Sequence, residues 1–267
     1  MTMDIIKEAV AIMGKPLIFH KEIAAQKPEN YRNEGAYCPF CDREALTNIF
    51  REEDDKIWLM NKYRTLDDTV QTLVIESQEH WADTPTYSKE ENRQIFRFTF
   101  DCWLDMLRDD QFESVLLFKN YGPLSGGSLR HPHSQIVGLK DKDGYEEISL
   151  DAFKGLEVGK KGNVTVTLST QPIMGMTEFN VSIADLNQLD DFADAVQSIV
   201  TYILTDDFSS RSGSYNLFFY PLGGRYYCKV FPRFIASPYF IGFKIGQVSY
   251  QGHLEKVVAE LQDYLPF

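Results

Sequence analysis

Residues 119–139 read KNYGPLSGGSLRHPHSQIVGL, and this stretch decides the interpretation of the fold. Two apolar segments flank a glycine- and serine-rich loop, which predicts a pair of strands that the loop connects. Glycines let the backbone approach a ligand closely, and successive N–H groups in such a turn can bind an anion. Loops of this composition are more often plain hairpin turns, so the residues that follow the loop matter most.

Two histidines and a glutamine follow the loop at alternate positions. Residues two apart in a strand point to the same face, so His131, His133 and Gln135 are expected on one surface. Imidazole can act as a metal ligand, a general base or a nucleophile. The alternative is a pair of buried, hydrogen-bonded histidines. Pro132 cannot donate to a sheet, which predicts an edge strand or a bulge here.

The rest of the chain predicts an α+β fold in two similar halves. Each half has the order strand-strand-helix-strand-strand, with short turns that favour antiparallel sheets and helices packed on a face. The first helix is expected to start at Ser88, which forms a capping-box pattern with Glu91, and both helices carry an apolar stripe. A polar segment, residues 138–155, is expected to connect the halves. The predicted strands are residues 57–63, 72–77, 114–120, 131–139, 163–170, 179–185, 214–221 and 226–234, and the stripes are Phe96, Phe100, Trp103 and Leu107, then Leu189, Phe192, Val196, Ile199 and Ile203.

Composition argues against several classes of protein. The chain has 267 residues, 43% of them hydrophobic, so it can form a sizeable core, and its net charge is −12. That charge disfavours non-specific binding to nucleic acid or anionic membranes. No stretch approaches the roughly 20 apolar residues of a membrane span, and the N-terminus, with Asp4, Lys7 and Glu8, does not have the pattern of a signal peptide. We therefore expect a soluble cytoplasmic protein.

Cys38 and Cys41 form a C-x-x-C pair in the segment AYCPFC. Such a pair is half of a tetrahedral zinc site, a redox motif or simply two buried thiols. The parallel βαβ setting of a thioredoxin motif is not predicted here. A zinc site needs two further ligands, and because Cys102 falls within a predicted apolar helix, Cys228 and the histidines are the candidates. The spacing does not choose among them.

The motifs together resemble one branch of a known superfamily. NYGPLSGGSLRHPHSQI, with CPFC, NKY and LVIESQEHW upstream of it, resembles the galactose-1-phosphate uridylyltransferase branch of the histidine-triad superfamily, over residues 36–139. That branch also contains sugar-nucleotide phosphorylases. The resemblance implies two histidine-triad-like halves: residues 1–145 with the zinc site and the nucleophile, and residues 146–267 with a degenerate second site.

The resemblance also implies roles for individual residues. His133 would attack the α-phosphorus of a nucleoside diphosphate sugar, and Gln135 would hydrogen-bond the phosphoryl oxygens of the covalent nucleotidyl-histidine. Triad hydrolases carry a third histidine where Gln135 stands, and glutamine goes with transfer to a sugar phosphate. Zinc would be held by Cys38, Cys41, His80 and His131, and the substrate by Phe40 near the base, Asn61 at the ribose and Asn120, Ser125, Gly126, Gly127 and Ser128 at the phosphates.

The function implied is a zinc-containing nucleotidyltransferase that uses a nucleoside diphosphate sugar and a sugar 1-phosphate. A homodimer is implied as well. A nucleotidyl hydrolase or phosphorylase on the same scaffold, or a non-catalytic nucleotide-binding protein, are the alternatives. The second half departs from the family pattern, because YYCKVFPRF has Tyr227 and Lys229 in place of a His-x-His pair, so a second metal site is not expected. Lys27 and Arg32 stand where the family has an arginine-rich segment.

Overall fold

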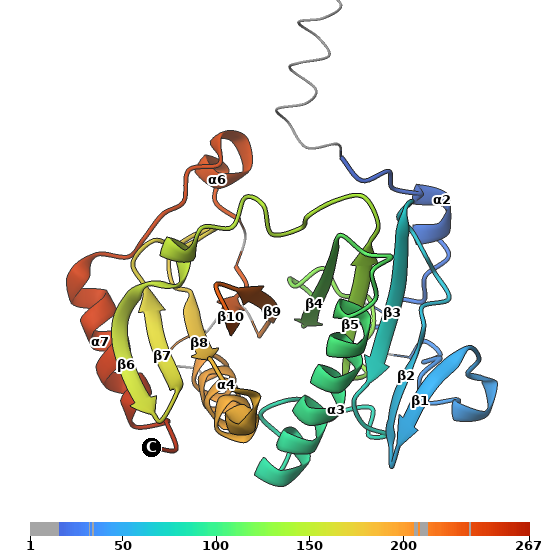
Figure 1. Cartoon of the computed structure of the whole chain (residues 1–267), viewed down its shortest axis with the longest axis horizontal. Helices are drawn as coiled ribbons and strands as arrows, with labels where there is room; N and C mark the ends of the chain where they lie inside the picture. Colours follow the sequence, from blue (N-terminus) through green and yellow to red (C-terminus); the bar gives the residue numbers. More distant parts are fainter. Residues whose placement is uncertain (1–15, 32, 34, 206–207, 209–212, 235) are drawn as a thin grey trace, which may run out of the picture.

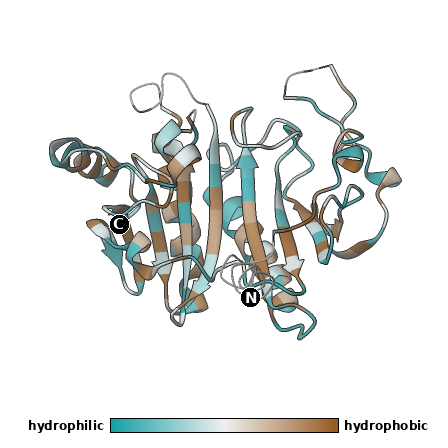
Figure 2. Cartoon of the chain, turned by 90° about the horizontal axis from the view of Figure 1, so that it is seen from above, coloured by the Kyte–Doolittle hydropathy of each residue, from teal (hydrophilic) through white to brown (hydrophobic). Residues whose placement is uncertain are grey.

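A computed structural model describes residues 16–31, 33, 35–205, 208, 213–234 and 236–267. The described residues form a ten-stranded antiparallel sheet with the order β1-β2-β3-β5-β4-β9-β10-β8-β7-β6. Figure 2 shows the strands of both halves side by side in this sheet. Read from its two ends, the sheet repeats one arrangement, because β1-β2-β3-β5-β4 in the first half corresponds to β6-β7-β8-β10-β9 in the second. The predicted α+β fold with two halves is confirmed.

Each half has three strands, a helix and two more strands. The strands of the first half are β1 (Ile49–Glu53), β2 (Lys56–Met60), β3 (Thr69–Ile75), β4 (Ser114–Tyr121) and β5 (His133–Leu139). Those of the second half are β6 (Gly155–Lys161), β7 (Val164–Ser169), β8 (Phe179–Ile183), β9 (Tyr215–Leu222) and β10 (Arg225–Pro232). The helices are α2 (Lys21–Ala24), α3 (Lys89–Leu107), α4 (Leu189–Ile203), α6 (Pro238–Phe243) and α7 (Gln251–Gln262). No helix of the described residues is both long and apolar enough to cross a bilayer.

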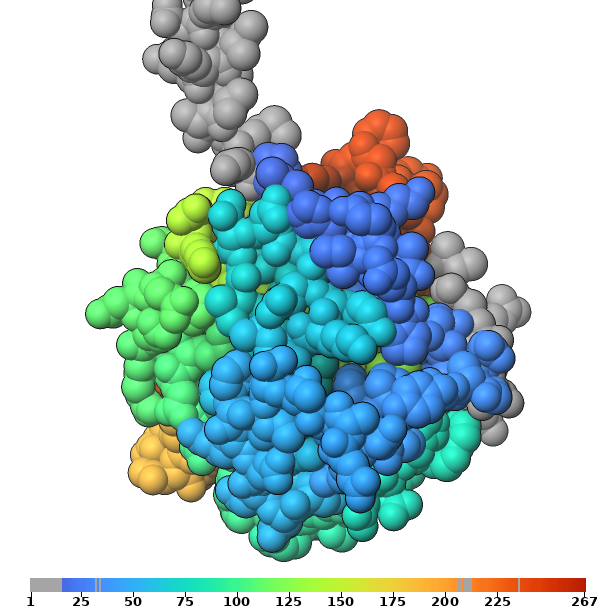
Figure 3. All heavy atoms as spheres, turned by 90° about the vertical axis from the view of Figure 1, so that its right-hand side faces the viewer, coloured from blue at the N-terminus to red at the C-terminus, as the bar shows by residue number. Residues whose placement is uncertain are grey.

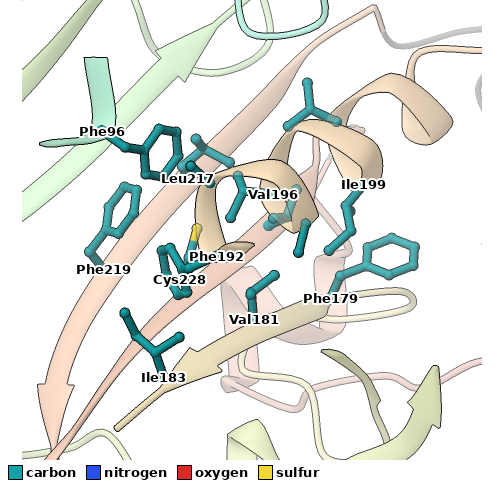
Figure 4. Packing of buried hydrophobic residues seen from close by; sticks show 14 of the residues in the cluster. Phe96, Phe179, Val181, Ile183, Phe192, Val196, Ile199, Leu217, Phe219 and Cys228 are labelled. Carbon is teal, nitrogen blue, oxygen red and sulfur yellow. The ribbon is translucent and has the colours of Figure 1, made fainter. Parts of the chain in front are cut away.

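Helices α3 and α4 lie on one face of the sheet and form the main core with it (Figure 1). The Ser88 hydroxyl accepts a hydrogen bond from Glu91 N and so caps α3, as predicted. Phe96, Phe100 and Trp103 are buried, so the predicted stripe faces the core. In Figure 4, side chains of α4 pack over β8, β9 and β10, which removes large apolar surfaces from water, worth about 1.5–3 kcal/mol for each side chain.

Two strands and the setting of Pro132 differ from the prediction. Strands β1 and β6, which form the two edges of the sheet, were not predicted. Both carry charged side chains and a register shift, so neither shows the regular alternation of apolar and polar residues that marks a strand in the sequence. The prediction that Pro132 marks an edge or a bulge is wrong. Pro132 directly precedes β5, which is a central strand between β3 and β4. The Pro132 carbonyl accepts a hydrogen bond from Glu76 N, and the missing N–H of the proline is not required for the pairing of the strands.

Candidate functional site

The candidate site lies on the face of the sheet opposite α3. Leu59, Leu73 and Gln135 are cross-strand neighbours on this face, whereas Ile136 and Val74 point into the core beneath α3. The site has two parts that share the start of β5. One is a cluster of cysteines and histidines, and the other is a pocket of about 580 Å³.

The cluster joins three segments that are distant in sequence. Four residues form the cluster: Cys38, Cys41, His80 and His131. Each offers one potential metal-ligating atom, a cysteine Sγ or a histidine ring nitrogen, and these four atoms all lie within 4.8 Å of one another. Cys41 Sγ is 3.3 Å from His80 Nδ1 and 3.4 Å from His131 Nδ1. These separations match the roughly 3.5 Å between ligands of a tetrahedral zinc with bonds of about 2.0–2.3 Å. Pairing of β3 with β5 creates the cluster, because His80 follows β3 and His131 precedes the antiparallel β5.

A hydrogen bond orients the ring of His131, and burial favours the neutral form of both histidines. His131 Nε2 is 2.8 Å from the Ser77 carbonyl, which can only accept, so Nε2 carries the proton and the Nδ1 lone pair faces the cysteines. Burial lowers the pKa of His131 to about 4, and burial, followed by the charge of Arg130, lowers the pKa of His80. Both imidazoles are therefore neutral near pH 7, the form that binds a metal.

The remaining cysteines do not join the cluster. Cys102 and Cys228 are fully buried in the main core. The sequence left Cys228 and the histidines as candidates for the two further ligands, and the structure brings His80 and His131 to the cysteine pair. In the absence of a cation, burial and then the neighbouring Cys38 raise the pKa of Cys41 to about 11. A bound metal reverses this effect, because it stabilises the thiolate.

The nucleophile candidate, His133, opens into the pocket beside the cluster. Its Nδ1 is 2.8 Å from the His131 carbonyl, so Nδ1 carries the proton and the Nε2 lone pair is left unprotonated. Burial lowers the pKa of His133, which favours this neutral form. The Phe40 ring lies edge-on to the ring of His133, with 5.3 Å between the ring centres, and fixes one side of the imidazole.

The structure brings most of the predicted substrate-binding residues to the pocket. Its walls include Phe40, Asn61, Gly126, Gly127, Ser128, His133 and Gln135. Ser125 is not among them, since its hydroxyl donates to the Gly122 carbonyl inside the loop. Asn120 lies behind the loop, where a Cβ on Gly127 would be 3.2 Å from the Asn120 Cβ.

The pocket is positively charged although the chain is acidic. Lys27, Lys62 and Arg64 line it, and no aspartate or glutamate is among its described wall residues. The sequence did not predict Lys62 and Arg64 as pocket residues: the NKY motif pointed only to Asn61, and Arg64 lies just beyond that motif. Arg32 lies outside the described residues. Figure 3 shows the surface hollowed between the dark blue N-terminal segment and the lighter blue residues that follow it, with yellow-green residues visible inside.

Comparison with known proteins places the chain in a family. Two models described as domains of unknown function match it, the DUF4931 N-terminal domain over residues 19–142 and the DUF4931 C-terminal domain over residues 145–265. The chain belongs to the DUF4931 family. A crystal structure of a DUF4931 family protein from Bacillus cereus is 42% identical, with 82% of this chain and 100% of that chain covered and a TM-score of 0.74. No curated protein matches the chain.

More distant solved structures share the fold of this DUF4931 protein. An ADP-glucose phosphorylase from Arabidopsis thaliana, solved with bound ADP-glucose, is 15% identical, with 90% and 92% of the two chains covered and a TM-score of 0.65. A uridylyltransferase is 15% identical, with 87% and 92% covered and a TM-score of 0.64. The resemblance seen in the sequence is thus confirmed as a likeness of fold.

Proposed function

We propose that the protein transfers a nucleotidyl group from a nucleoside diphosphate sugar to a phosphate-bearing acceptor, through a covalent intermediate on His133. The observation that carries this proposal is the state of the His133 ring. Its Nδ1–H is donated to the His131 carbonyl, so an unprotonated Nε2 meets a pocket that also contains Gln135 and the glycine loop. A neutral, oriented imidazole is the form of histidine that acts as a nucleophile.

The first step forms a bond between His133 Nε2 and the α-phosphorus. The bond from that phosphorus to the bridging oxygen breaks, and the sugar 1-phosphate leaves with the electron pair. The imidazole gains positive charge, which the His131 carbonyl stabilises through the Nδ1–H hydrogen bond. In the second step, a phosphate oxygen of the acceptor attacks the same phosphorus and frees Nε2. The Gln135 amide would donate to the phosphoryl oxygens in both steps.

The charge of the pocket supports a substrate with two phosphates. Lys27, Lys62 and Arg64 supply three cations without a neighbouring carboxylate in the wall. The backbone N–H of Gly126 would add an uncharged donor at the loop, whereas the Gly127 N–H donates to Ser125 Oγ at 3.3 Å. Such a site attracts a diphosphate and neutralises the charge that shifts during phosphoryl transfer.

The four residues of the cluster fit zinc by donor type and spacing. Cys38, Cys41, His80 and His131 would hold it. Zinc in such a closed site supplies rigidity, and here it would fix the backbone of His131, whose carbonyl orients His133.

A panel of acceptors tests the function. The protein is mixed with UDP-glucose or ADP-glucose, and with glucose 1-phosphate, galactose 1-phosphate, inorganic phosphate or water as the acceptor. Exchange with a sugar phosphate is the expected result, and turnover with phosphate or with water alone identifies a phosphorylase or a hydrolase. Binding without turnover, and without a nucleotidyl adduct by intact mass, identifies a nucleotide-binding protein and contradicts the proposal.

We also propose that each chain consists of two functional units, residues 1–145 and residues 146–267. In addition, we propose that two copies of the chain form a homodimer. Exposed apolar side chains between residues 234 and 250 support an interface, among them Tyr239, Ile241 and Phe243. Light scattering at micromolar concentration is expected to give twice the chain mass of 30.8 kDa. A monomer mass contradicts the dimer.

A further inference from the structure

The second half of the chain holds the glycine loop of the first half. This loop, residues 122–128, connects β4 to β5, and its outer side rests on residues just before β9 and just after β10. Leu124 N donates to the Ser214 hydroxyl at 3.2 Å, and Arg233 Nε donates to the Leu124 carbonyl at 3.3 Å. Gly122, with φ +83°, approaches so closely that a Cβ would lie 2.3 Å from Ser214 Oγ. The loop therefore takes its shape from both halves.

Asn216 makes the deepest of these contacts. It lies opposite Asn120 where β4 pairs with β9, and it is 1% exposed. Its Nδ2 is 2.6 Å from Asn120 Oδ1, 3.1 Å from the Ser125 carbonyl and 3.5 Å from the Lys119 carbonyl. One buried amide thus contacts the strand before the loop, a side chain and the loop itself.

These contacts determine which way the Asn120 amide faces. Backbone carbonyls only accept, so the group that Asn216 turns toward Ser125 must be its NH₂. The Asn120 atom beside that NH₂ must then be Oδ1, and Asn120 Nδ2 is turned away from Asn216. Asn216 Oδ1 is buried and has no partner among the described residues, so the three acceptors alone set this orientation.

The freed end of Asn120 lies beside the phosphate loop. Asn120 Nδ2 makes no hydrogen bond within the described part of the chain, whereas Oδ1 is held by Asn216. The side chain packs against Gly127, which lines the pocket. A two-hydrogen donor is thereby kept in one orientation next to the backbone N–H groups of the loop.

We propose that Asn216 is a positioning residue for the phosphate site, supplied by the half that has no nucleophile. By holding Asn120 Oδ1 and the Ser125 carbonyl, it directs the Asn120 N–H donors toward a phosphate of the bound nucleoside diphosphate. This inference rests on the proposed function, since it assumes that the ligand of the loop is a nucleotide phosphate.

A double-mutant cycle tests the coupling. Calorimetry gives the dissociation constants of UDP and ADP for the wild type, Asn216→Ala, Asn120→Ala and the double variant. The rate of adduct formation with UDP-glucose and ADP-glucose is then measured for the same four proteins. Each single change is expected to weaken binding about 10-fold, because a hydrogen bond to a charged phosphate is lost or misdirected. The double variant is expected to bind within about 2-fold of Asn120→Ala, since Asn216 acts through Asn120. Losses that multiply to about 100-fold overturn the inference.

Asn92→Ala is the matched control. Asn92 is also 1% exposed, and its Nδ2 donates to the Ala193 carbonyl at 3.0 Å, which links α3 to α4 away from the loop. It should lose stability as Asn216→Ala does and keep nucleotide affinity. Equal loss of affinity in both variants would mean general destabilisation and would overturn the inference. If Asn216→Ala does not fold, Asn216→Ser, which keeps one donor, takes its place in the cycle.

The outcomes separate this inference from the proposed function. If the wild type binds a nucleotide and forms no adduct, the transfer reaction is contradicted, and the cycle in binding affinity still decides the role of Asn216. If adduct forms and the cycle is additive, the function stands and the role of Asn216 is wrong. If the wild type binds neither UDP nor ADP, both are overturned.

Discussion

The two halves have the same strand order, but the strands beside the central pair β4 and β9 differ. These strands are β5 in the first half and β10 in the second. In the first half, β5 begins at His133 and borders a pocket of about 580 Å³. In the second half, the corresponding strand β10 carries Lys229, which is fully buried. Its ammonium is bound by Glu178 at 3.0 Å, Asn180 Oδ1 at 2.8 Å and the Ala152 carbonyl at 2.7 Å, and the Phe153 ring lies against it.

The two strands differ in how far their polar side chains are satisfied. On β10, every ammonium hydrogen has an acceptor, and Glu178 itself accepts from the backbone of Ile173, Met174 and Gly175. On β5, one nitrogen of His133 is satisfied and the other faces the pocket. Satisfied polar groups rigidify a protein, whereas reactivity needs a lone pair that the protein leaves free. In this structure the second half contacts the glycine loop of the first through Ser214, Asn216 and Arg233.

The largest effect is expected at the nucleophile. His133→Ala should lower the rate of adduct formation by about 10⁴-fold or more, in line with the loss of other covalent nucleophiles. Zinc content and stability should stay close to those of the wild type. Intact-mass analysis after mixing with the active nucleotide sugar measures the adduct, and Lys229→Met is the control at the corresponding strand. An adduct that persists in His133→Ala would place the nucleophile elsewhere.

Removal of the metal ligands is expected to have the next largest effect. Wild-type protein purified without chelators should contain about one zinc per chain, and Cys41→Ser or His131→Ala should lower this to near zero. The adduct rate should fall with it, because the His131 backbone holds His133. Elemental analysis gives the metal content, with Cys228→Ser as the control cysteine outside the cluster. Wild-type protein without zinc would rule out this part of the site.

Gln135→Ala tests the oxyanion partner. The adduct should still form, about 100-fold more slowly, which is typical of losing a single donor to a developing negative charge. Gln135→His is expected to raise hydrolysis of the adduct relative to transfer. Single-turnover kinetics with and without the sugar phosphate separates the two steps. An unchanged rate in Gln135→Ala would remove Gln135 from the reaction.

In the second half, the expected effect is on stability. Lys229→Met leaves Glu178 buried without its cation, which should cost about 3 kcal/mol of unfolding free energy, and it should change the adduct rate less than about 2-fold. Adding Glu178→Gln to this variant should restore part of the loss. Urea denaturation gives the free energies. A large loss of activity in a folded Lys229→Met variant would mean that the second half does more than support.

The smallest effect is the pH dependence of that ion pair. Burial lowers the pKa of Lys229 below its ordinary value of 10.5, against the opposing effect of Glu178. Between the lowered folded pKa and 10.5, the unfolded chain binds more protons, so the stability due to Lys229 rises with pH. The difference in unfolding free energy between wild type and Lys229→Met should therefore grow from pH 7 toward pH 10. A difference that shrinks would contradict this direction.

Local patterns in the sequence correctly predicted the elements around the site. The apolar stripe of α3 and the alternation along β5 both hold, with His133 and Gln135 on the pocket and Ile136 in the core. The edge strands β1 and β6 were missed because an edge strand is paired on one side and carries exposed charges, which removes the alternation that marks a buried strand.

The sequence by itself determined which residues share a face, because the period of a strand or a helix is fixed by backbone geometry. That was enough to place His133 and Gln135 on one face of β5 and to suggest a phosphate loop before them, whereas His131 lies before the strand begins and belongs to the cluster of cysteines and histidines. No local pattern decides which distant residues join them: the family resemblance named His80, and the tertiary structure brings it to the cluster. The choice of His80 over Cys228 depends on the pairing of β3 with β5, and the contact of Asn216 with Asn120 depends on the pairing of β4 with β9. Spacing along the chain contains neither pairing, since the register between strands is set by the packing of the whole sheet.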